Sequence, residues 1–214
     1  MTSALTVYAG ALHRAARGGD GALRLVDPAG TLLRHLDTGA WHGEPTPGDS
    51  GLLARCTGPT LDVGCGPGRL AAALARRGVP ALGIDVSAAA VRLARARGAD
   101  AVVQDVFAPL RDGRSWRHTL LADGNIGIGG DPARLLARCR ELLAPGGSVL
   151  AEVEPPGSPG WRGRVALTDT RRTSEPFPWA VVGVDDLGPL AEQAGLLPAE
   201  SWTEDERWFV CLSR

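Results

Sequence analysis

The spacing of apolar residues changes near residue 60 and separates two regions of different pattern. From residue 60 to 153, short apolar runs typical of buried strands alternate with longer segments in which apolar residues recur at helical spacing. Such alternation indicates a parallel sheet with helices on both faces. The expected strands are 60–63, 81–85, 101–104, 118–122 and 148–153, and the expected helices are 69–77, 88–97 and 132–143.

The segments on either side of this region complete the expected fold. Before it, we predict a helix over 4–16, strands over 23–27 and 31–36 around a Pro-Gly turn, and a short helix over 51–56 capped by Asp49 or Ser50. After it, we predict an inserted hairpin of 164–167 and 179–184, a helix capped by Asp185 or Asp186 that ends at Ala194, and strands 199–202 and 207–212. The sheet then has seven strands and is mostly parallel. We expect a cap segment, residues 1–56, packed on a core, residues 57–214, within one domain.

Composition and charge narrow the classes of function. The 214 residues are 44% hydrophobic and 22% charged, which suits one globular domain with a full core. A net charge of -1 gives no broad attraction for a phosphate backbone, so nucleic acid is not expected as a partner. Apolar runs fall short of a membrane span of ~20 residues, and we expect neither a signal peptide nor membrane association.

The four cysteines lie far apart in the sequence. Cys56, Cys65, Cys139 and Cys211 show no C-x-x-C spacing, which predicts neither a metal site nor a disulfide framework. We therefore expect a cytoplasmic protein without a bound metal ion. Composition leaves the oligomeric state open.

A glycine-rich turn follows the strand at 60–63. The sequence Leu61-Asp62-Val63-Gly64-Cys65-Gly66-Pro67-Gly68 predicts a strand that turns sharply into a helix. Glycines permit positive φ and let a ligand approach the backbone, and the amides of a helix start favour a negative or polar group. A dinucleotide fingerprint would need a glycine at position 69, where this chain has Arg69.

The pattern Asp-x-Gly-x-Gly-x-Gly resembles instead the first motif of the class I S-adenosylmethionine-dependent methyltransferases. The turn Leu143-Ala144-Pro145-Gly146-Gly147 resembles that family's Leu-Lys-Pro-Gly-Gly signature, with Ala144 in place of the lysine. The resemblance covers about residues 57–154. It implies a Rossmann-like, doubly wound α/β fold and S-adenosylmethionine as the cofactor.

The resemblance also assigns cofactor contacts. Asp85 ends the second core strand, where ligands of open parallel sheets bind, and is expected to accept hydrogen bonds from the ribose hydroxyls. Asp105 is expected to accept from the adenine amino group, and Asp62 to orient the turn and the ligand's amino group. The alternatives are a helix-capping or merely solvent-exposed Asp85 and a turn role for Asp105. The full expected set is Asp62, Gly64, Cys65, Gly66, Gly68, Asp85, Val86, Asp105, Val106 and Ala122.

The sequence pattern for residues that would act on the methyl acceptor is weaker than the pattern for the cofactor site. Asp123 and Asn125 lie in the glycine-rich stretch 122–132, at the sheet edge expected to face the methyl group, although the stretch also suits a simple loop before a helix capped by Asp131. His42, beside Trp41, is our first choice of general base. The other candidate bases are His118, Asp123, Glu152 and Glu154, and Trp41, Trp161, Phe177 and Trp179 form either an acceptor pocket or core packing.

These features together predict an enzyme that transfers a methyl group from S-adenosylmethionine to a small-molecule acceptor by in-line displacement. Two other classes stay open at this point. One is a protein that binds S-adenosylmethionine without catalysis, and the other is a nicotinamide-dependent oxidoreductase.

Overall fold

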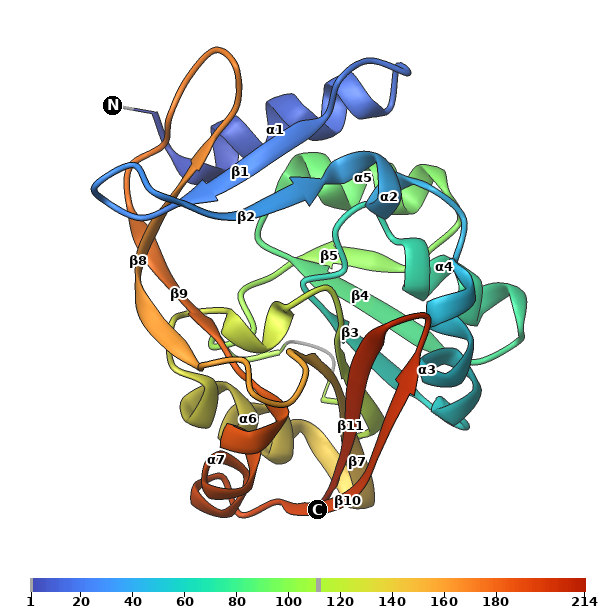
Figure 1. Cartoon of the computed structure of the whole chain (residues 1–214). Helices are drawn as coiled ribbons and strands as arrows, with labels where there is room; N and C mark the ends of the chain where they lie inside the picture. The colour runs from blue at the N-terminus through green and yellow to red at the C-terminus, as the bar shows by residue number, and fades with distance from the viewer. Residues whose placement is uncertain (1, 111–112) are drawn as a thin grey trace.

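The computed structural model describes residues 2–110 and 113–214, and its centre is a seven-stranded sheet (Figure 1). The strands follow the order β10-β11-β7-β6-β3-β4-β5. Strands β3 to β7 pair in parallel, whereas β11 runs antiparallel to both β7 and β10. The bounds are β3 Thr60–Val63, β4 Ala81–Asp85, β5 Ala101–Val103, β6 Trp116–Leu121, β7 Leu143–Val153, β10 Leu197–Glu204 and β11 Arg207–Ser213. The predicted mostly parallel, seven-stranded α/β fold is confirmed.

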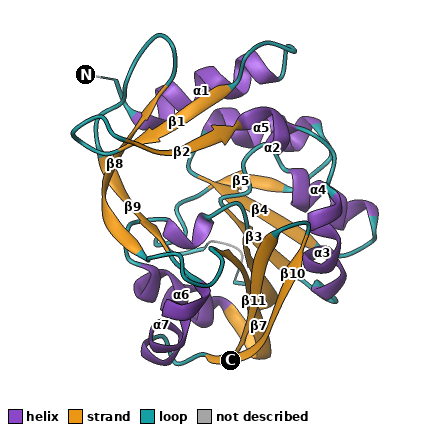
Figure 2. Ribbon diagram, viewed as in Figure 1, coloured by secondary structure: helices purple, strands orange, loops and turns teal. Residues whose placement is uncertain are grey.

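Helices cover both faces of this sheet, because successive strand residues point to opposite sides. On β7, Val149 and Ala151 pack in the cluster that includes residues of α6 and α7, whereas Leu150 packs with residues of α3 and α4. Figure 2 shows α6 and α7 on one side and α3, α4 and α5 on the other. Their bounds are α3 Ser50–Arg55, α4 Arg69–Arg76, α5 Ala88–Ala96, α6 Pro132–Leu142 and α7 Leu187–Gln193.

A second, antiparallel sheet of four strands stands over the carboxyl edge of the first, and we call it the cap sheet (Figures 1 and 2). It consists of β1 Ala22–Val26, β2 Leu32–Asp37, β8 Trp161–Thr168 and β9 Phe177–Val181, in the order β2-β1-β8-β9. Helix α1, Ala4–Ala15, buries Val7 and Ala11 against it. Both hairpins were predicted, but their union through β1 and β8 was not, because that pairing joins distant segments.

Several local predictions need correction. The expected turn at 145–147 lies inside β7, where Gly146 takes a φ of 71°. Asp185 and Asp186 do not cap α7 with their side chains, since they accept hydrogen bonds from the amides of Gly157 (2.7 Å) and Gly160 (3.0 Å) and so fasten the loop before β8. The elements not predicted are helix α2 Thr38–His42 and the short 3-10 turns η1 Pro47–Asp49, η2 Asn125–Gly127 and η3 Val184–Asp186.

Two further observations concern the helices and the cysteines. Across residues 2–110 and 113–214, no helix combines the length and apolarity needed to cross a membrane. All four cysteines are free thiols, and three of them are buried.

Candidate functional site

A cavity of about 840 Å³ lies between the cap sheet and the carboxyl edge of the core sheet. This is the edge at which open parallel sheets bind ligands. Its floor is formed by residues that follow β3, β4, β5 and β6, and its roof by α1 and the cap sheet. The volume falls within the range of about 300 to 1,000 Å³ typical of small-molecule sites.

The glycine turn enters the cavity wall at Gly64 and Gly66, whose φ values of 74° and 53° lie in the left-handed region. A Cβ at Gly64 would stand 2.7 Å from Nδ2 of Asn125, and one at Gly66 would stand 3.2 Å from the hydroxyl of Tyr8. A side chain at either position would therefore have a strained backbone, and one at Gly64 would also collide with Asn125. The glycines leave bare backbone facing the cavity.

Gly68 and Cys65 serve the turn in a different way. Gly68, with a φ of 85°, precedes α4 and does not line the cavity; a Cβ there would lie 2.7 Å from Cβ of Ala94. Cys65 does line the cavity, and its sulfur packs closely over Gly83. Burial raises the pKa of the Cys65 thiol, so this group stays protonated and is no nucleophile at neutral pH.

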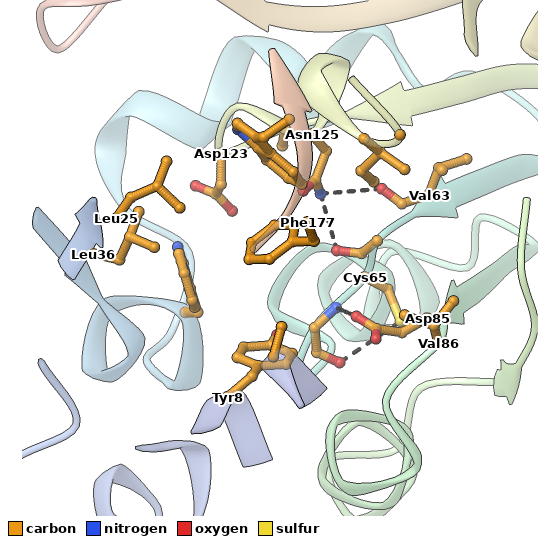
Figure 3. A pocket seen from close by; sticks show the side chains of 18 of the residues that line it. Tyr8, Leu25, Leu36, Val63, Cys65, Asp85, Val86, Asp123, Asn125 and Phe177 are labelled. Atoms are coloured by element: carbon orange, nitrogen blue, oxygen red, sulfur yellow. Dashed lines mark hydrogen bonds between the residues drawn. The ribbon is translucent and has the colours of Figure 1, made fainter. Parts of the chain in front are cut away.

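Asp85 is fixed by the backbone around it. Its carboxylate accepts a hydrogen bond from the amide of Gly66 at 3.0 Å (Figure 3) and another from the amide of Ser87 at 2.7 Å. Burial raises the pKa of Asp85 above its ordinary value, and the two amides oppose that rise. The N-cap of α5 is the Ser87 side chain, which accepts from the amide of Ala90, so Asp85 is not the side-chain cap of this helix.

Asp62 presents a buried acceptor without a donor. The residue is 2% exposed, and its Oδ2 has no hydrogen-bond partner in the part of the chain that the structure describes. Burial, with a contribution from the charge of Asp123, raises the pKa of Asp62 to about 7. A buried carboxylate oxygen is costly when unpaired, so the site suits a ligand group that donates to it.

The far end of the cavity carries the residues expected at an adenine ring. Val86, 51% exposed, lines the cavity together with Asp105 and Val106. Asp105 also accepts a hydrogen bond from the amide of Phe107 at 2.9 Å and so stabilises a turn. It is nevertheless solvent-exposed at the cavity wall. Ala122 lines the cavity at the end of β6.

A buried ion network supports Asp123. Arg69 donates to both carboxylate oxygens of Asp123, at 2.7 and 2.5 Å, and to Asp49, which is 0% exposed. Arg207 donates to Asp49 at 2.8 Å and to Glu152 at 2.7 Å. Burial raises the pKa of Asp123, against the lowering effect of Arg69. Sequence reasoning missed the network because its members come from five distant segments.

Asn125 holds the glycine turn in place. Its Nδ2 donates to the carbonyls of Val63 (3.0 Å) and Gly64 (2.9 Å), as the dashed lines in Figure 3 show. The side chain lines the cavity but its amide protons are engaged by backbone. Asn125 is therefore placed to position the turn and, through it, the ligand.

The glycines after Asn125 serve the cap sheet. A Cβ at Gly127 would lie 2.0 Å from the carbonyl oxygen of Ala180, and one at Gly130 would lie 2.9 Å from Cβ of Pro178. Between them, Ile128 pairs with Trp179 in an isolated antiparallel bridge. Gly127 and Gly130 thus allow β9 to pack against the core. For these two glycines of the stretch 122–132, this favours a structural loop over close approach to a ligand.

The two histidine candidates lie outside the cavity. His42 ends α2, and its carbonyl accepts a hydrogen bond from Arg97; burial and the charge of Arg97 lower the pKa of its ring. His118 is buried at the start of β6 beside Ser148. The structure does not bring His42 to the other expected site residues, because α2 turns its neighbour Trp41, rather than His42, to the cavity.

The roof of the cavity contains residues that the sequence pattern did not single out. Tyr8 lies over the turn at Gly66 and meets Trp41 edge to face, with ring centroids 6.2 Å apart. Burial raises the pKa of the Tyr8 phenol, and the charge of Asp85 adds to that rise, so the hydroxyl stays neutral. Arg34 of β2 pairs with Glu154, at the end of β7, and both line the cavity.

Comparisons with known proteins agree with this arrangement. Residues 60–147 match the family described as methyltransferase domain. A ubiquinone biosynthesis O-methyltransferase from Alkalilimnicola ehrlichii is 34% identical over 115 residues, which are 46% of this chain and 44% of that protein. The chain thus matches less than half the length of this curated relative.

Solved structures extend the likeness to the whole chain. A methyltransferase from Bacteroides fragilis, crystallised with S-adenosylhomocysteine, has a TM-score of 0.80 at 22% identity and covers 99% of this chain and 96% of its own. The CcbJ methyltransferase from Streptomyces caelestis has a TM-score of 0.61 at 18% identity, with 81% and 91% covered. At these identities the likeness establishes the fold.

Proposed function

We propose that this protein transfers a methyl group from S-adenosylmethionine to a small-molecule acceptor, since residues 60–147 match the family described as methyltransferase domain. The observation that supports the proposal most is that one cavity brings together the glycine turn, Asp62, Asp85 and Asp105. The Bacteroides fragilis structure holds S-adenosylhomocysteine in the same fold.

The residues of the cavity fit this cofactor group by group. Oδ2 of Asp62 lacks a donor and suits the cofactor's amino group. Asp85, held by two amides, suits the two ribose hydroxyls, because a carboxylate accepts several hydrogen bonds at once. Asp105 and Val86 suit the adenine amino group and ring face.

The charges around the turn favour this cofactor over a dinucleotide. Arg69, at the start of α4, is already paired with Asp49 and Asp123, so its charge is not available to a pyrophosphate. The carboxylate of Asp85, which accepts a hydrogen bond from the amide of Gly66, would repel such a group. The same carboxylate attracts the positive charges that S-adenosylmethionine carries.

Methyl transfer requires that the acceptor is aligned with the methyl group, that water is excluded and that a base takes the acceptor's proton. When bound, S-adenosylmethionine supplies a methyl group on a cationic sulfur. A nucleophile attacks the methyl carbon in line with the carbon–sulfur bond, and no covalent enzyme intermediate is needed. Cap and core cover the cavity from two sides and so shield part of it from water. Of the candidate bases, Asp123 and Glu154 line it, and both oxygens of Asp123 are already held by Arg69.

Calorimetric titration with S-adenosylmethionine, S-adenosylhomocysteine and NAD tests the cofactor. We expect binding of the first two and none of NAD. Binding of NAD alone would refute the proposal. Formation of S-adenosylhomocysteine in the presence of candidate acceptors then separates an enzyme from a protein that binds the cofactor without catalysis.

A further inference from the structure

The roof of the cavity is apolar, with one charged side chain. Leu25 of β1, Leu36 of β2 and Phe177 of β9 turn toward the cavity (Figure 3). In α1 and the four strands of the cap sheet, all of which the structure describes, Arg34 is the only charged residue that lines it, and Arg34 is paired with Glu154. Burial of an ionic group against such a surface is costly.

The charges at the floor add a second restriction. Asp62, Asp85, Asp105 and Asp123 line the core side of the cavity. The first three are assigned to the cofactor above, so an anionic acceptor would meet Asp123 and Glu154, whereas a cationic acceptor would meet the positive sulfur of the proposed cofactor. Both walls therefore favour an uncharged acceptor.

The aromatic side chains of the roof favour a ring compound. Phe177 and Trp179 meet edge to face, with centroids 6.2 Å apart and an interplanar angle of 80°. Both line the cavity, and Trp161 lines it from β8. Aromatic walls of this kind contact planar rings over large areas.

From these observations, and resting on the proposed function, we propose that the methyl acceptor is an uncharged aromatic ring compound with a hydroxyl group, bound beneath the cap sheet, and that Glu154 takes the hydroxyl proton. Aliphatic amines are cationic and carboxylates anionic at neutral pH, whereas a phenol, with a pKa of about 10, is neutral. The phenolic oxygen forms the new bond to the methyl carbon, the carbon–sulfur bond breaks with its electrons passing to sulfur, and the proton moves to the Glu154 carboxylate. Arg34 holds that carboxylate at the cavity wall.

Three naphthalene compounds of similar size test the charge preference. We would titrate 2-naphthol, 2-naphthoate and 2-(aminomethyl)naphthalene into the protein saturated with S-adenosylhomocysteine. The naphthol should bind at least about tenfold more tightly than either ion, because each ion must be desolvated among apolar side chains. Tighter binding of an ion, or no binding of 2-naphthol to the saturated protein, would overturn the proposal. Failure of S-adenosylhomocysteine itself to bind would refute the proposed function, and this proposal with it.

Matched variants on one strand locate the subsite. Leu36 lines the cavity, whereas Leu32 on the same strand does not line it and is 46% exposed. Leu36→Asp should weaken 2-naphthol binding at least about tenfold, while Leu32→Asp should leave it unchanged. Retained binding of S-adenosylhomocysteine shows that each variant is folded. Equal 2-naphthol affinity in both variants would place the acceptor elsewhere.

Glu154→Gln tests the proton acceptor. With 2-naphthol as substrate, kcat should fall about 10²-fold at pH 7, while the affinity for S-adenosylhomocysteine stays unchanged. The loss should shrink at high pH, where the naphthol ionises without help. Unchanged kcat, or a loss independent of pH, would remove Glu154 from this role.

Discussion

Arg69→Met removes the centre of the buried ion network and keeps a side chain of similar length. Arg69 is 5% exposed and donates to Asp49, which is 0% exposed, and to Asp123. After the substitution, Asp49 keeps only its hydrogen bonds from Arg207 and from the amide and hydroxyl of Thr46. A buried carboxylate then lacks one of its two cations.

The expected loss follows from this geometry. Removal of one partner from a buried ion pair costs about 3 to 5 kcal/mol. Because Arg207 still donates to Asp49 at 2.8 Å, we expect the lower end of that range. In a protein of this size each 1 kcal/mol moves Tm by about 2 to 4 °C, so a loss of about 3 kcal/mol lowers Tm by about 6 to 12 °C.

The loss should depend on pH in a defined direction. Burial raises the pKa of Asp49, but the hydrogen bonds from Arg69 and Arg207 outweigh burial and hold it below the ordinary value of 3.8. A lowered native pKa contributes stability above the unfolded pKa, and that stability is lost as pH falls through the native pKa. The difference between wild type and Arg69→Met should therefore be full at pH 7 and narrow below 3.8.

Urea unfolding followed by far-UV circular dichroism, at pH 7 and at decreasing pH, measures both effects. Arg76→Met is the matched control on the same helix, because Arg76 is 51% exposed in its pair with Glu44 and should contribute under about 1 kcal/mol. A loss in Arg69→Met no larger than in Arg76→Met, or a difference that persists unchanged at low pH, would contradict the reasoning.

Three further predictions concern the cofactor and the cap. Asp85→Asn should weaken binding of S-adenosylmethionine by about 1.5 to 3 kcal/mol, the contribution of hydrogen bonds to a charged group, and an unchanged Kd by calorimetry would remove Asp85 from the site. Because burial raises the pKa of Asp62 to about 7, the native protein keeps a proton between pH 3.8 and 7 that the unfolded chain has lost, so the free energy of unfolding without ligand should fall as pH rises through this window. Cofactor binding near pH 6 should release this proton. Calorimetry in buffers of different ionisation enthalpy would detect the release, and Asp62→Asn should abolish it. Gly127→Ala should destabilise by about 1 to 3 kcal/mol through overpacking against Ala180, whereas Gly188→Ala, which meets no atom within 4 Å, should not lower Tm.

Features that depend on neighbouring residues could be predicted from the sequence. The strand, glycine turn and helix at 60–76 form as predicted, since the positive φ values at Gly64, Gly66 and Gly68 are local requirements of that turn. Alternation of strands and helices predicted the core sheet for the same reason. The expected cofactor residues, apart from Gly68, line one cavity because parallel strands place their carboxyl ends at one edge. Their roles stay predictions.

Contacts between distant segments could not be predicted in this way and are seen in the folded protein. Pairing of β1 with β8 joined two separately predicted hairpins into the cap sheet, and no periodicity encodes which open strand edges will pair. The network of Arg69, Asp49, Asp123 and Arg207 is likewise a contact between distant segments. Coulomb attraction depends on the spatial distance between charges, which their separation along the sequence does not give. His42, chosen for its chemistry, lies outside the cavity because the short helix α2 sets the direction of its side chain. Residue type therefore predicted the candidate chemistry, whereas packing decided which candidates reach the site.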